Sequence, residues 1–255
     1  GEETHRRQEA CGQNGGEKDH RSQKAGSQIC GEESRREEAQ ICAGVKKEQY
    51  MHVLMLNGSP RANGNTALAL HEMEKVFTEQ GVICELIHVG QKDIRGCIAC
   101  RQCVKLGHCV FDDVVNELAP KFQACDGLVV GSPVYYASAN ATLVALLTRL
   151  FFSTPFDKRM KVGACVVAAR RGGLSATFDE LNKFFAISGM PIATSRYWNS
   201  IHGREAGEAA GDAEGLQTMR TLARNMTFLM KSIQLGKEKY GLPEREEPVF
   251  THFIR

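Results

Sequence analysis

Four cysteines stand close together in the middle of the chain, at a spacing that favours metal chemistry. They are Cys97, Cys100, Cys103 and Cys109, in the pattern C-x2-C-x2-C-x5-C. Thiolates gathered in so short a segment are typical of a metal centre, because each deprotonated sulfur is a strong ligand. Structural zinc sites usually draw on two separated cysteine pairs. The compact triplet with a fourth member therefore favours a [4Fe–4S] cluster, with zinc, or no metal, as the alternatives.

A second stretch of the chain has the composition of a phosphate-binding loop. Asn57-Gly58-Ser59-Pro60-Arg61-Ala62-Asn63-Gly64-Asn65-Thr66 follows a short apolar run and precedes an amphipathic one. A loop between a strand and a helix offers backbone N–H groups, hydroxyls and the positive end of the helix to an anion. It lacks the lysine of a Walker loop and the third glycine of the dinucleotide fingerprint. Ser59, Arg61 and Thr66 suit a single terminal phosphate such as that of FMN, and Asn65 or Thr66 is expected to cap the helix.

Two later loops follow apolar runs and are expected to face the same ligand. The first contains two adjacent tyrosines that could pack on an isoalloxazine ring, although ordinary rim packing is the alternative. The second is rich in arginine and glycine, so its backbone can approach a ligand and its charge can neutralise a reduced flavin or a nicotinamide phosphate. The residues concerned are Pro133, Val134, Tyr135 and Tyr136 in the first loop, and Arg170, Gly172 and Gly173 in the second.

The hydrophobic pattern predicts the scaffold that brings these loops together. Strand-like and helix-like segments alternate from residue 51 onward, which favours a parallel sheet covered by helices on both faces. With an edge-like second strand, the order 2-1-3-4-5 of the flavodoxin fold fits, and in that fold ligands bind beyond the carboxyl ends of strands one and three. The five strands are expected at 52–57, 82–89, 127–131, 161–169 and 192–195, and the helices at 66–80, 112–125, 140–152, 177–187 and 213–231.

Composition separates the first 50 residues from the rest of the chain. Residues 1 to about 48 contain no Leu, Phe, Met or Trp, so they are expected to form a disordered tail at 1–50. Because Met51 directly precedes the first strand, our hypothesis is that it is the true start and that 1–50 are translated upstream sequence. A native peptide from before Met51, found by mass spectrometry, would disprove this. Residues 51–255 suffice for one domain, with the cysteine loop inserted at 95–110.

Charge and hydropathy narrow the classes of partner. The formal net charge of +2 gives no indication of nucleic-acid or polybasic membrane binding. No apolar run reaches the length of a transmembrane helix, and the N-terminus has no signal-peptide core. A cytoplasmic protein is expected. Cys11, Cys30 and Cys42 of the tail receive no role, and Trp198 is expected in the core.

With these motifs, residues 51–255 resemble the NAD(P)H-dependent FMN reductase superfamily and, within it, the iron–sulfur flavoproteins. The resemblance rests on the phosphate loop, the compact cysteine motif and 131–136, supported by 195–199 and 251–255. It implies that the phosphate loop, including Gly64, Asn65 and Thr66, holds FMN, that the tyrosine loop holds the ring, and that the four cysteines hold a [4Fe–4S] cluster. Val144 and Thr148 depart from this pattern, since relatives often carry Lys and Asp there.

The resemblance also implies a function. The chain is expected to be an FMN-dependent oxidoreductase that passes electrons between NAD(P)H or ferredoxin, FMN, the cluster and an unidentified small-molecule or protein acceptor. The flavin performs the chemistry, so no side chain is assigned as nucleophile or base. A homodimer or homotetramer is expected, as in relatives. The alternatives are a cluster-free NAD(P)H:FMN or quinone reductase and a non-enzymatic, flavodoxin-like electron carrier.

Overall fold

The computed structural model describes residues 50–251 and 253 of the chain. These residues belong to one compact unit that begins at Tyr50. The predicted tail, apart from Tyr50, lies outside the described residues, and so do its three cysteines and most of the 251–255 segment.

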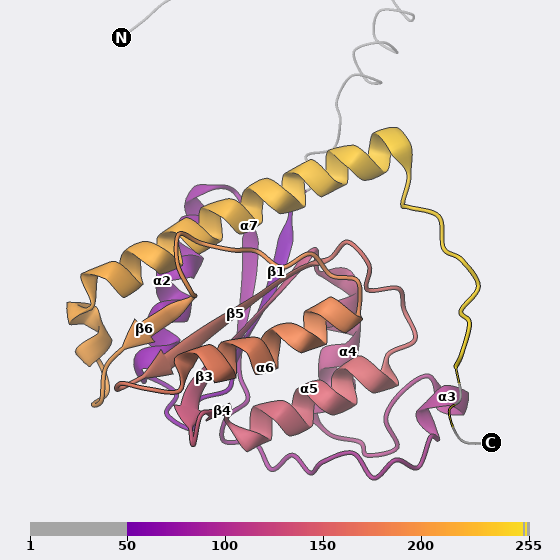
Figure 1. Ribbon diagram of the computed structural model, residues 1–255, viewed down its shortest axis with the longest axis horizontal. Coiled ribbons are helices and arrows are strands. Elements are labelled where there is room, and N and C mark those ends of the chain that lie inside the picture. Colours follow the sequence, from indigo (N-terminus) through magenta and orange to yellow (C-terminus); the bar gives the residue numbers. More distant parts are fainter. Residues whose placement is uncertain (1–49, 252, 254–255) are drawn as a thin grey trace, which may run out of the picture. The chain divides into compact units, whose positions relative to one another are not determined.

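A parallel sheet forms the middle layer of this unit. Its strands run in the spatial order β2-β1-β3-β5-β6 (Figure 1). The strands are β1 (His52–Asn57), β2 (Ile83–His88), β3 (Gly127–Tyr135), β5 (Val162–Ala169) and β6 (Ser200–His202). A sixth, two-residue strand, β4 (Ser138–Ala139), pairs antiparallel with the end of β3. Apart from β4, this is the predicted order 2-1-3-4-5, and the fold is flavodoxin-like.

The last parallel strand was predicted at the wrong place. Ile192 forms an isolated bridge to Gly163, whereas β6 pairs with the end of β5. Between them the chain leaves the sheet, and Ser195 Oγ lies within hydrogen-bond distance of the Tyr197 carbonyl and Asn199 Oδ1. Such local bonds compete with a strand ladder, which explains why the apolar run at 192–195 does not continue as a strand. The expected core position of Trp198 was also wrong, because its side chain is half exposed.

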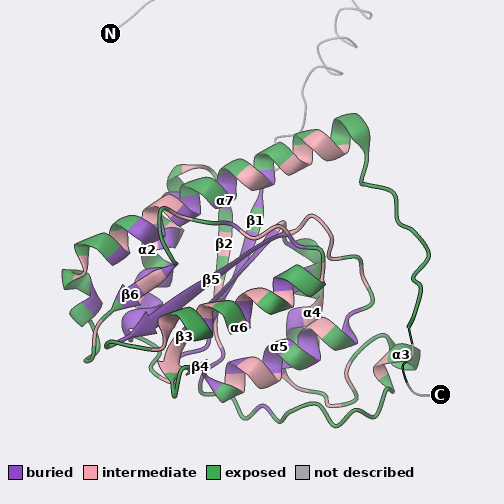
Figure 2. Ribbon diagram, viewed as in Figure 1, coloured by how far each residue is buried: buried purple, intermediate pink, exposed green. Residues whose placement is uncertain are grey.

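Helices cover both faces of the sheet (Figure 1). Along β1, Val53 and Met55 pack in one core cluster and Leu54 and Leu56 in the other, because successive side chains point to opposite faces. Figure 2 shows β1 and β5 almost wholly buried, whereas the edge strand β2 is only partly buried. The first cluster includes α2 (Asn65–Glu79) and α7 (Ala213–Tyr240), and the second α4 (Val114–Ala124), α5 (Ala141–Ser153) and α6 (Leu174–Ile187).

The predicted helices are all present, with some differences at their ends. Helix α7 continues to Tyr240, beyond the predicted end at 231. Two short helices were not predicted, α3 (Cys103–Leu106) in the cysteine loop and the 3-10 helix η1 (Glu208–Gly211) before α7. Among the described helices, none is both long and apolar enough to cross a membrane.

Candidate functional site

The carboxyl ends of the strands meet around one cavity of about 220 Å³. The predicted phosphate loop, the end of β3 and the end of β5 all contribute to it, together with a fourth loop that follows β6. Its lining includes Ser59, Arg61, Gly64, Asn65, Thr66, Pro133, Val134, Tyr135, Arg170, Gly203 and Arg204. Tyr136, Gly172 and Gly173, also predicted, are not in the lining. The topology thus brings together loops that are far apart in sequence, as the flavodoxin-like order requires.

Side chains of the phosphate loop form hydrogen bonds to the loop's own backbone and hold it in a tight turn. The Asn57 carboxamide accepts from the Ser59 N–H at 3.0 Å and donates to the Ala62 carbonyl at 3.2 Å. Ser59 Oγ in turn accepts from the Arg61 N–H at 3.1 Å. The loop leads directly into α2, whose first N–H groups have no acceptor within the helix. These N–H groups and the positive end of the helix suit an anionic ligand.

Two residues outside this loop fix its backbone, and the sequence analysis identified neither. A Cβ on Gly90 would lie 2.0 Å from the Ser59 carbonyl oxygen, so a side chain has no room there. Asn140 donates from Nδ2 to the Gly58 carbonyl at 2.6 Å, and its own N–H donates to Ser132 Oγ. No motif in the sequence marks either residue, because both act through contacts with a distant segment of the chain.

Asn65 has a different role from the predicted helix cap. The N-cap of α2 is Gly64, which makes no side-chain cap bond. The buried Asn65 carboxamide instead donates to the Glu205 carbonyl at 2.9 Å and accepts from the N–H groups of Gly207 and Ala209. Buried backbone N–H groups need partners. Asn65 therefore ties the phosphate loop to the loop after β6.

The tyrosine loop forms a tight hairpin between β3 and β4. Its two central residues, Tyr136 and Ala137, have φ values of +51° and +59°, in the left-handed region that such turns require but that favours Gly or Asn. Tyr135 is half exposed and Tyr136 fully exposed. The Glu180 carboxylate of α6 holds the hairpin, because it accepts from Ser138 Oγ and, at 2.7 Å, from the Ala139 N–H.

The four predicted cysteines line a second cavity. Helix α5 contributes Arg149, Phe152 and Ser153 to the same lining. Cys97 and Cys100 are exposed, whereas Cys103 and Cys109 are partly buried. The loop has left-handed backbone at Ala99 and Arg101, and the Ala99 N–H donates to Cys97 Sγ at 3.4 Å.

The donor set of this second cavity fits a thiolate-bound metal centre. Its lining contains four sulfurs and no carboxylate. Soft thiolate ligands favour an iron–sulfur cluster or zinc. Within residues 50–251, no three His, Cys, Asp or Glu side chains are already close enough to hold a metal ion. Metal binding would therefore draw the cysteine side chains together.

Comparison with known proteins decides the family. The family model for NADPH-dependent FMN reductase matches residues 51–205. The chain belongs to this family.

Relatives place the chain within one branch of the FMN reductase family. It is 34% identical over 195 residues to an iron–sulfur flavoprotein of Methanocaldococcus jannaschii, which covers 72% of this chain and 100% of the relative. It is 29% identical over 194 residues to an iron–sulfur flavoprotein of Methanosarcina thermophila, covering 74% and 100% of the two chains. The branch is that of the iron–sulfur flavoproteins, as the motifs predicted. The chain is an FMN-binding oxidoreductase.

Solved structures support the flavodoxin-like fold of this chain. RosB with the bound intermediate 8-demethyl-8-formylriboflavin 5′-phosphate superposes with a TM-score of 0.59 at 15% identity, covering 80% of this chain and 94% of RosB. A flavone reductase superposes with a TM-score of 0.56 at 16% identity, covering 72% and 64% of the two chains.

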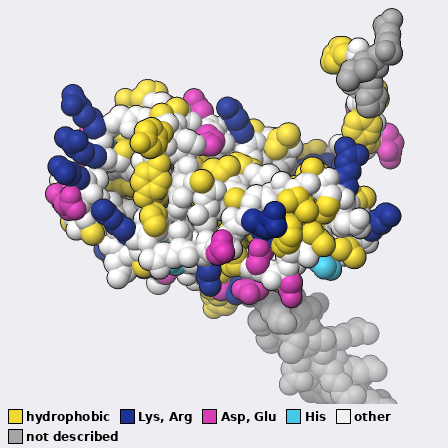
Figure 3. Space-filling model, turned by 90° about the horizontal axis from the view of Figure 1, so that it is seen from below, with side chains coloured by type: hydrophobic (Ala, Val, Ile, Leu, Met, Phe, Trp, Pro, Cys, Tyr) yellow, Lys and Arg dark blue, Asp and Glu magenta, His cyan; other side chains and the backbone are white. Residues whose placement is uncertain are grey.

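The charge of the chain differs between regions of its surface. Arg61, Arg170 and Arg204 line the cavity at the carboxyl ends of the strands. In Figure 3, Lys and Arg side chains gather at the left edge of the view, the side towards which β3 and β5 end in Figure 1. Positive charge at this end suits an anionic ligand and would attract it from solution.

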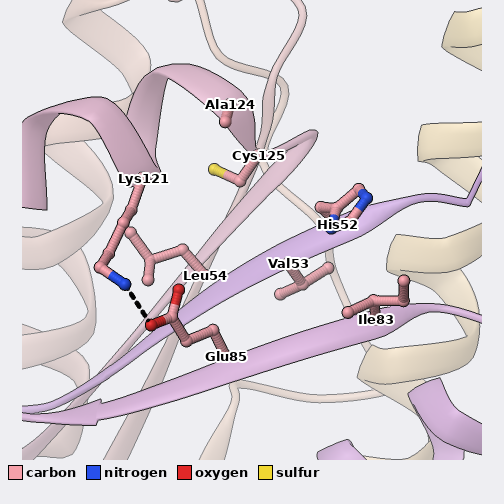
Figure 4. A pocket seen from close by; sticks show the side chains of 8 residues that line it. All are labelled: His52, Val53, Leu54, Ile83, Glu85, Lys121, Ala124 and Cys125. Atoms are coloured by element: carbon pink, nitrogen blue, oxygen red, sulfur yellow. Dashed lines mark hydrogen bonds and ion pairs between the residues drawn. The ribbon is translucent and has the colours of Figure 1, made fainter.

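A third cavity lies at the opposite ends of the strands (Figure 4). It is lined by the first residues of β1 and β2 and by α4, and Lys121 pairs with Glu85 across it. Burial raises the pKa of the Cys125 thiol in this cavity to about 11, so the thiol stays protonated at neutral pH and is a poor nucleophile. None of the predicted site residues lines this cavity, and it is not a candidate for the cofactor.

The Asn65 contacts lead to a first prediction. In Asn65→Ala, the N–H groups of Gly207 and Ala209 lose their acceptor, which costs about 1–3 kcal/mol. We expect the FMN dissociation constant to rise about tenfold, since 1.4 kcal/mol corresponds to a factor of ten. Fluorescence titration of the FMN-free protein measures this. Asn225→Ala is the matched control, because its exposed carboxamide bonds to Thr194 far from the cavity. Equal FMN affinity in the two variants would contradict the role of Asn65.

The Glu180 contacts lead to a second prediction. Glu180→Ala removes the acceptor that holds Ser138 and Ala139, so the strained turn at Tyr136 and Ala137 is expected to open. Hydrogen exchange of the Ala139 amide should speed up at least tenfold, and FMN affinity should fall several-fold. The exposed neighbour Asp179 provides the control, Asp179→Ala. Unchanged exchange at Ala139 would show that the carboxylate is not needed.

Proposed function

We propose that this protein is an FMN-dependent oxidoreductase that also carries a [4Fe–4S] cluster on its four cysteines, with NAD(P)H or a reduced ferredoxin as electron donor. The observation that supports it is the separation of two cavities in one chain. One is lined by the loops expected to bind FMN, the other by four sulfurs. FMN accepts a hydride or single electrons, and an iron–sulfur cluster exchanges single electrons.

The residues of the first cavity would bind and orient the flavin. Ser59, Thr66 and the N–H groups at the start of α2 suit the phosphate, with Arg61 offsetting its charge. The chain from Pro133 to Tyr135 would lie along the ring. Arg170 and Arg204 line the same cavity and would hold an anionic donor beside the flavin. All these groups bind and position, and none is needed as a nucleophile.

The residues of the second cavity would hold the cluster. Cys97, Cys100, Cys103 and Cys109 supply the four thiolates that a cubane cluster takes, without a ligand from elsewhere in the described chain. Arg101 lines the same cavity, and its positive charge would favour the more negative, reduced form of the cluster.

A purification without oxygen tests the proposal. A flavin spectrum over a broad absorption shoulder, with about four irons and four acid-labile sulfides per chain, is the expected result. Flavin with zinc, or with no metal, would reject the cluster and leave a simple FMN reductase. Oxidation of NADPH and NADH by the purified protein separates an enzyme from a carrier. If neither is oxidised while reduced ferredoxin bleaches the flavin, the protein is an electron carrier.

The assembly of this protein stays a prediction. A homodimer or homotetramer is expected from the family, and light scattering after gel filtration measures the mass. The mass of a monomer at physiological concentration would overturn the prediction of an oligomer.

A further inference from the structure

Helix α5 carries a buried arginine that the sequence analysis did not identify. The Arg149 side chain is 1% exposed, and it is the largest fully buried side chain of the described residues. Arginine is almost never fully buried unless it is paired. Its position among the leucines of α5 hides it in the sequence, so its role follows from what it contacts.

Arg149 contacts both a carboxylate and a sulfur. Its Nη1 and Nη2 donate to the two oxygens of Asp113 at 2.6 and 2.9 Å, a forked ion pair. Its Nε and Nη2 also lie 3.3 and 3.2 Å from Cys109 Sγ. Nη1 also donates to the Arg95 carbonyl, and the Phe111 carbonyl lies 3.4 Å from Nη2, so it shares the N–H groups that face Asp113 and Cys109. Every nitrogen of the guanidinium is used, and two of the three donate to one sulfur.

The guanidinium keeps its charge in this buried position. An arginine guanidinium stays protonated in proteins, and the forked ion pair with Asp113 compensates its charge here. Asp113 is the N-cap of α4 and accepts from the Val115 N–H, so it is fixed as well. A single cation thus serves two acceptors, the carboxylate and the sulfur.

Cys109 is held more firmly than the other three cysteines. The Asn116 carboxamide accepts from the Cys109 N–H and donates to the Cys109 carbonyl, both at 3.0 Å. Its backbone and its sulfur are therefore both fixed to the body of the domain. Cys97 and Cys100 lie on an exposed loop segment with left-handed residues.

We propose that Arg149 is a positioning residue for the metal centre, fixing the Cys109 sulfur towards the cavity and supplying the positive charge that offsets its thiolate. Cys109 is then the preorganised first ligand, around which the exposed cysteines close. This inference rests on the proposed function, in that the four cysteines bind a metal. A purely structural alternative is that Arg149 only fastens 109–113 to α5.

Side chains that hydrogen-bond to metal ligands have a measurable effect on metal affinity. Loss of such a side chain usually lowers metal affinity about 10- to 100-fold. Positive charge and hydrogen bonds to sulfur favour the reduced form of a cluster, so removing Arg149 shifts the midpoint potential to more negative values. Removing Asp113 leaves the guanidinium charge uncompensated and shifts it to more positive values. If Arg149 acted only by fastening the loop through its ion pair with Asp113, both variants would break the same contact, and they would shift the midpoint potential in the same direction.

The experiment compares Arg149→Met, Asp113→Asn and Arg95→Met in the full chain. Arg95 is the matched control, because its guanidinium also lies over the Phe111 ring but no bond from it to a cysteine sulfur is seen in the described residues. Asparagine also caps helices, so Asp113→Asn preserves the start of α4. Should Arg149→Met not fold, the double variant Arg149→Met/Asp113→Asn leaves no unpaired charge and takes its place. Circular dichroism and melting of the metal-free proteins report folding.

Two readouts decide the role of Arg149. Titration of the metal-free, reduced proteins with Co²⁺, followed by thiolate-to-metal absorption, should show about 10- to 100-fold weaker binding in Arg149→Met than in Arg95→Met. Spectroelectrochemistry of the iron-loaded proteins should show the opposite potential shifts. Co²⁺ affinities within twofold of each other, with unchanged potentials, would overturn the proposal. Wild-type protein without iron and sulfide would refute the cluster, while the Co²⁺ titration would still test Arg149.

Discussion

Gly90→Ala should abolish FMN retention. A methyl group at this position would stand 2.0 Å from the Ser59 carbonyl oxygen, 2.2 Å from its carbon and 2.7 Å from the Gly58 carbonyl carbon. All three are backbone atoms of the phosphate loop, so no side chain can rotate away to make room. The strand end also cannot move freely, because the N–H groups of Val89 and Gly90 both donate to the Asn57 carbonyl. The loop itself must shift.

The size of this effect follows from the cost of overpacking. Inserted methyl groups in tight sites cost about 1–3 kcal/mol, and a clash with fixed backbone lies at or above the upper end. About 3 kcal/mol taken from FMN binding corresponds to a dissociation constant more than 100-fold higher. The measurement is the FMN content after purification, with a fluorescence titration of the FMN-free protein and a melting curve.

Gly211→Ala is the control for the Gly90 prediction. Nothing lies within 4 Å of a Cβ at Gly211, and its φ is not in the left-handed region. This variant should keep wild-type FMN affinity and melting temperature. If Gly90→Ala binds FMN as tightly as Gly211→Ala, the close approach of the β2 end does not shape the phosphate loop.

The fold and the candidate loops could be predicted because their signals are local. The apolar runs and their alternation with helices gave the sheet order, and hydroxyls, glycines and cysteines at short spacing marked the loops. Glycines and short polar side chains between a strand and a helix are typical of an anion-binding loop. The failure at 192–195 has the same origin, because the run is apolar but the turn at Ser195 and Asn199 is set by side-chain bonds.

What supports the site could not be predicted, because it depends on contacts between distant residues. Gly90 meets Ser59 across adjacent strands, Asn65 bonds to the loop after β6, and Arg149 reaches the cysteine loop. Gly90 and Arg149 belong to no motif, and the motif that contains Asn65 does not show which backbone groups its side chain faces. Only the tertiary structure shows which N–H groups and sulfurs they face.

One helix connects the two cavities. At the start of α5, Asn140 holds the phosphate loop through the Gly58 carbonyl, and nine residues later Arg149 holds Cys109. A rise of about 1.5 Å per residue places these two positions about 13–14 Å apart along the helix. The cavities share no lining residue, so FMN binding and metal binding are expected to be separable by mutation.

Cys100→Ser should empty the metal centre and leave the flavin in place. The Cys100 side chain is exposed, so its replacement is expected to leave the fold intact. A serine hydroxyl does not ionise near neutral pH and cannot replace a thiolate ligand. A cubane cluster with three cysteine ligands is labile, so the iron content should fall from about four per chain to near zero. Because the two cavities are separate, FMN affinity should stay within about twofold of wild type.

The control for this variant is Cys84→Ala. Cys84 lies in β2, partly buried and outside the cysteine loop, and burial raises the pKa of its thiol to about 12. It is therefore no candidate ligand, and its loss should leave iron, sulfide and FMN unchanged. If Cys100→Ser keeps its iron, the cluster is not bound by the four-cysteine loop. If Cys84→Ala loses iron to the same extent, the loss reflects oxidation or unfolding rather than a missing ligand. Iron loss confined to Cys100→Ser, with FMN retained, assigns the metal to this loop independently of the flavin.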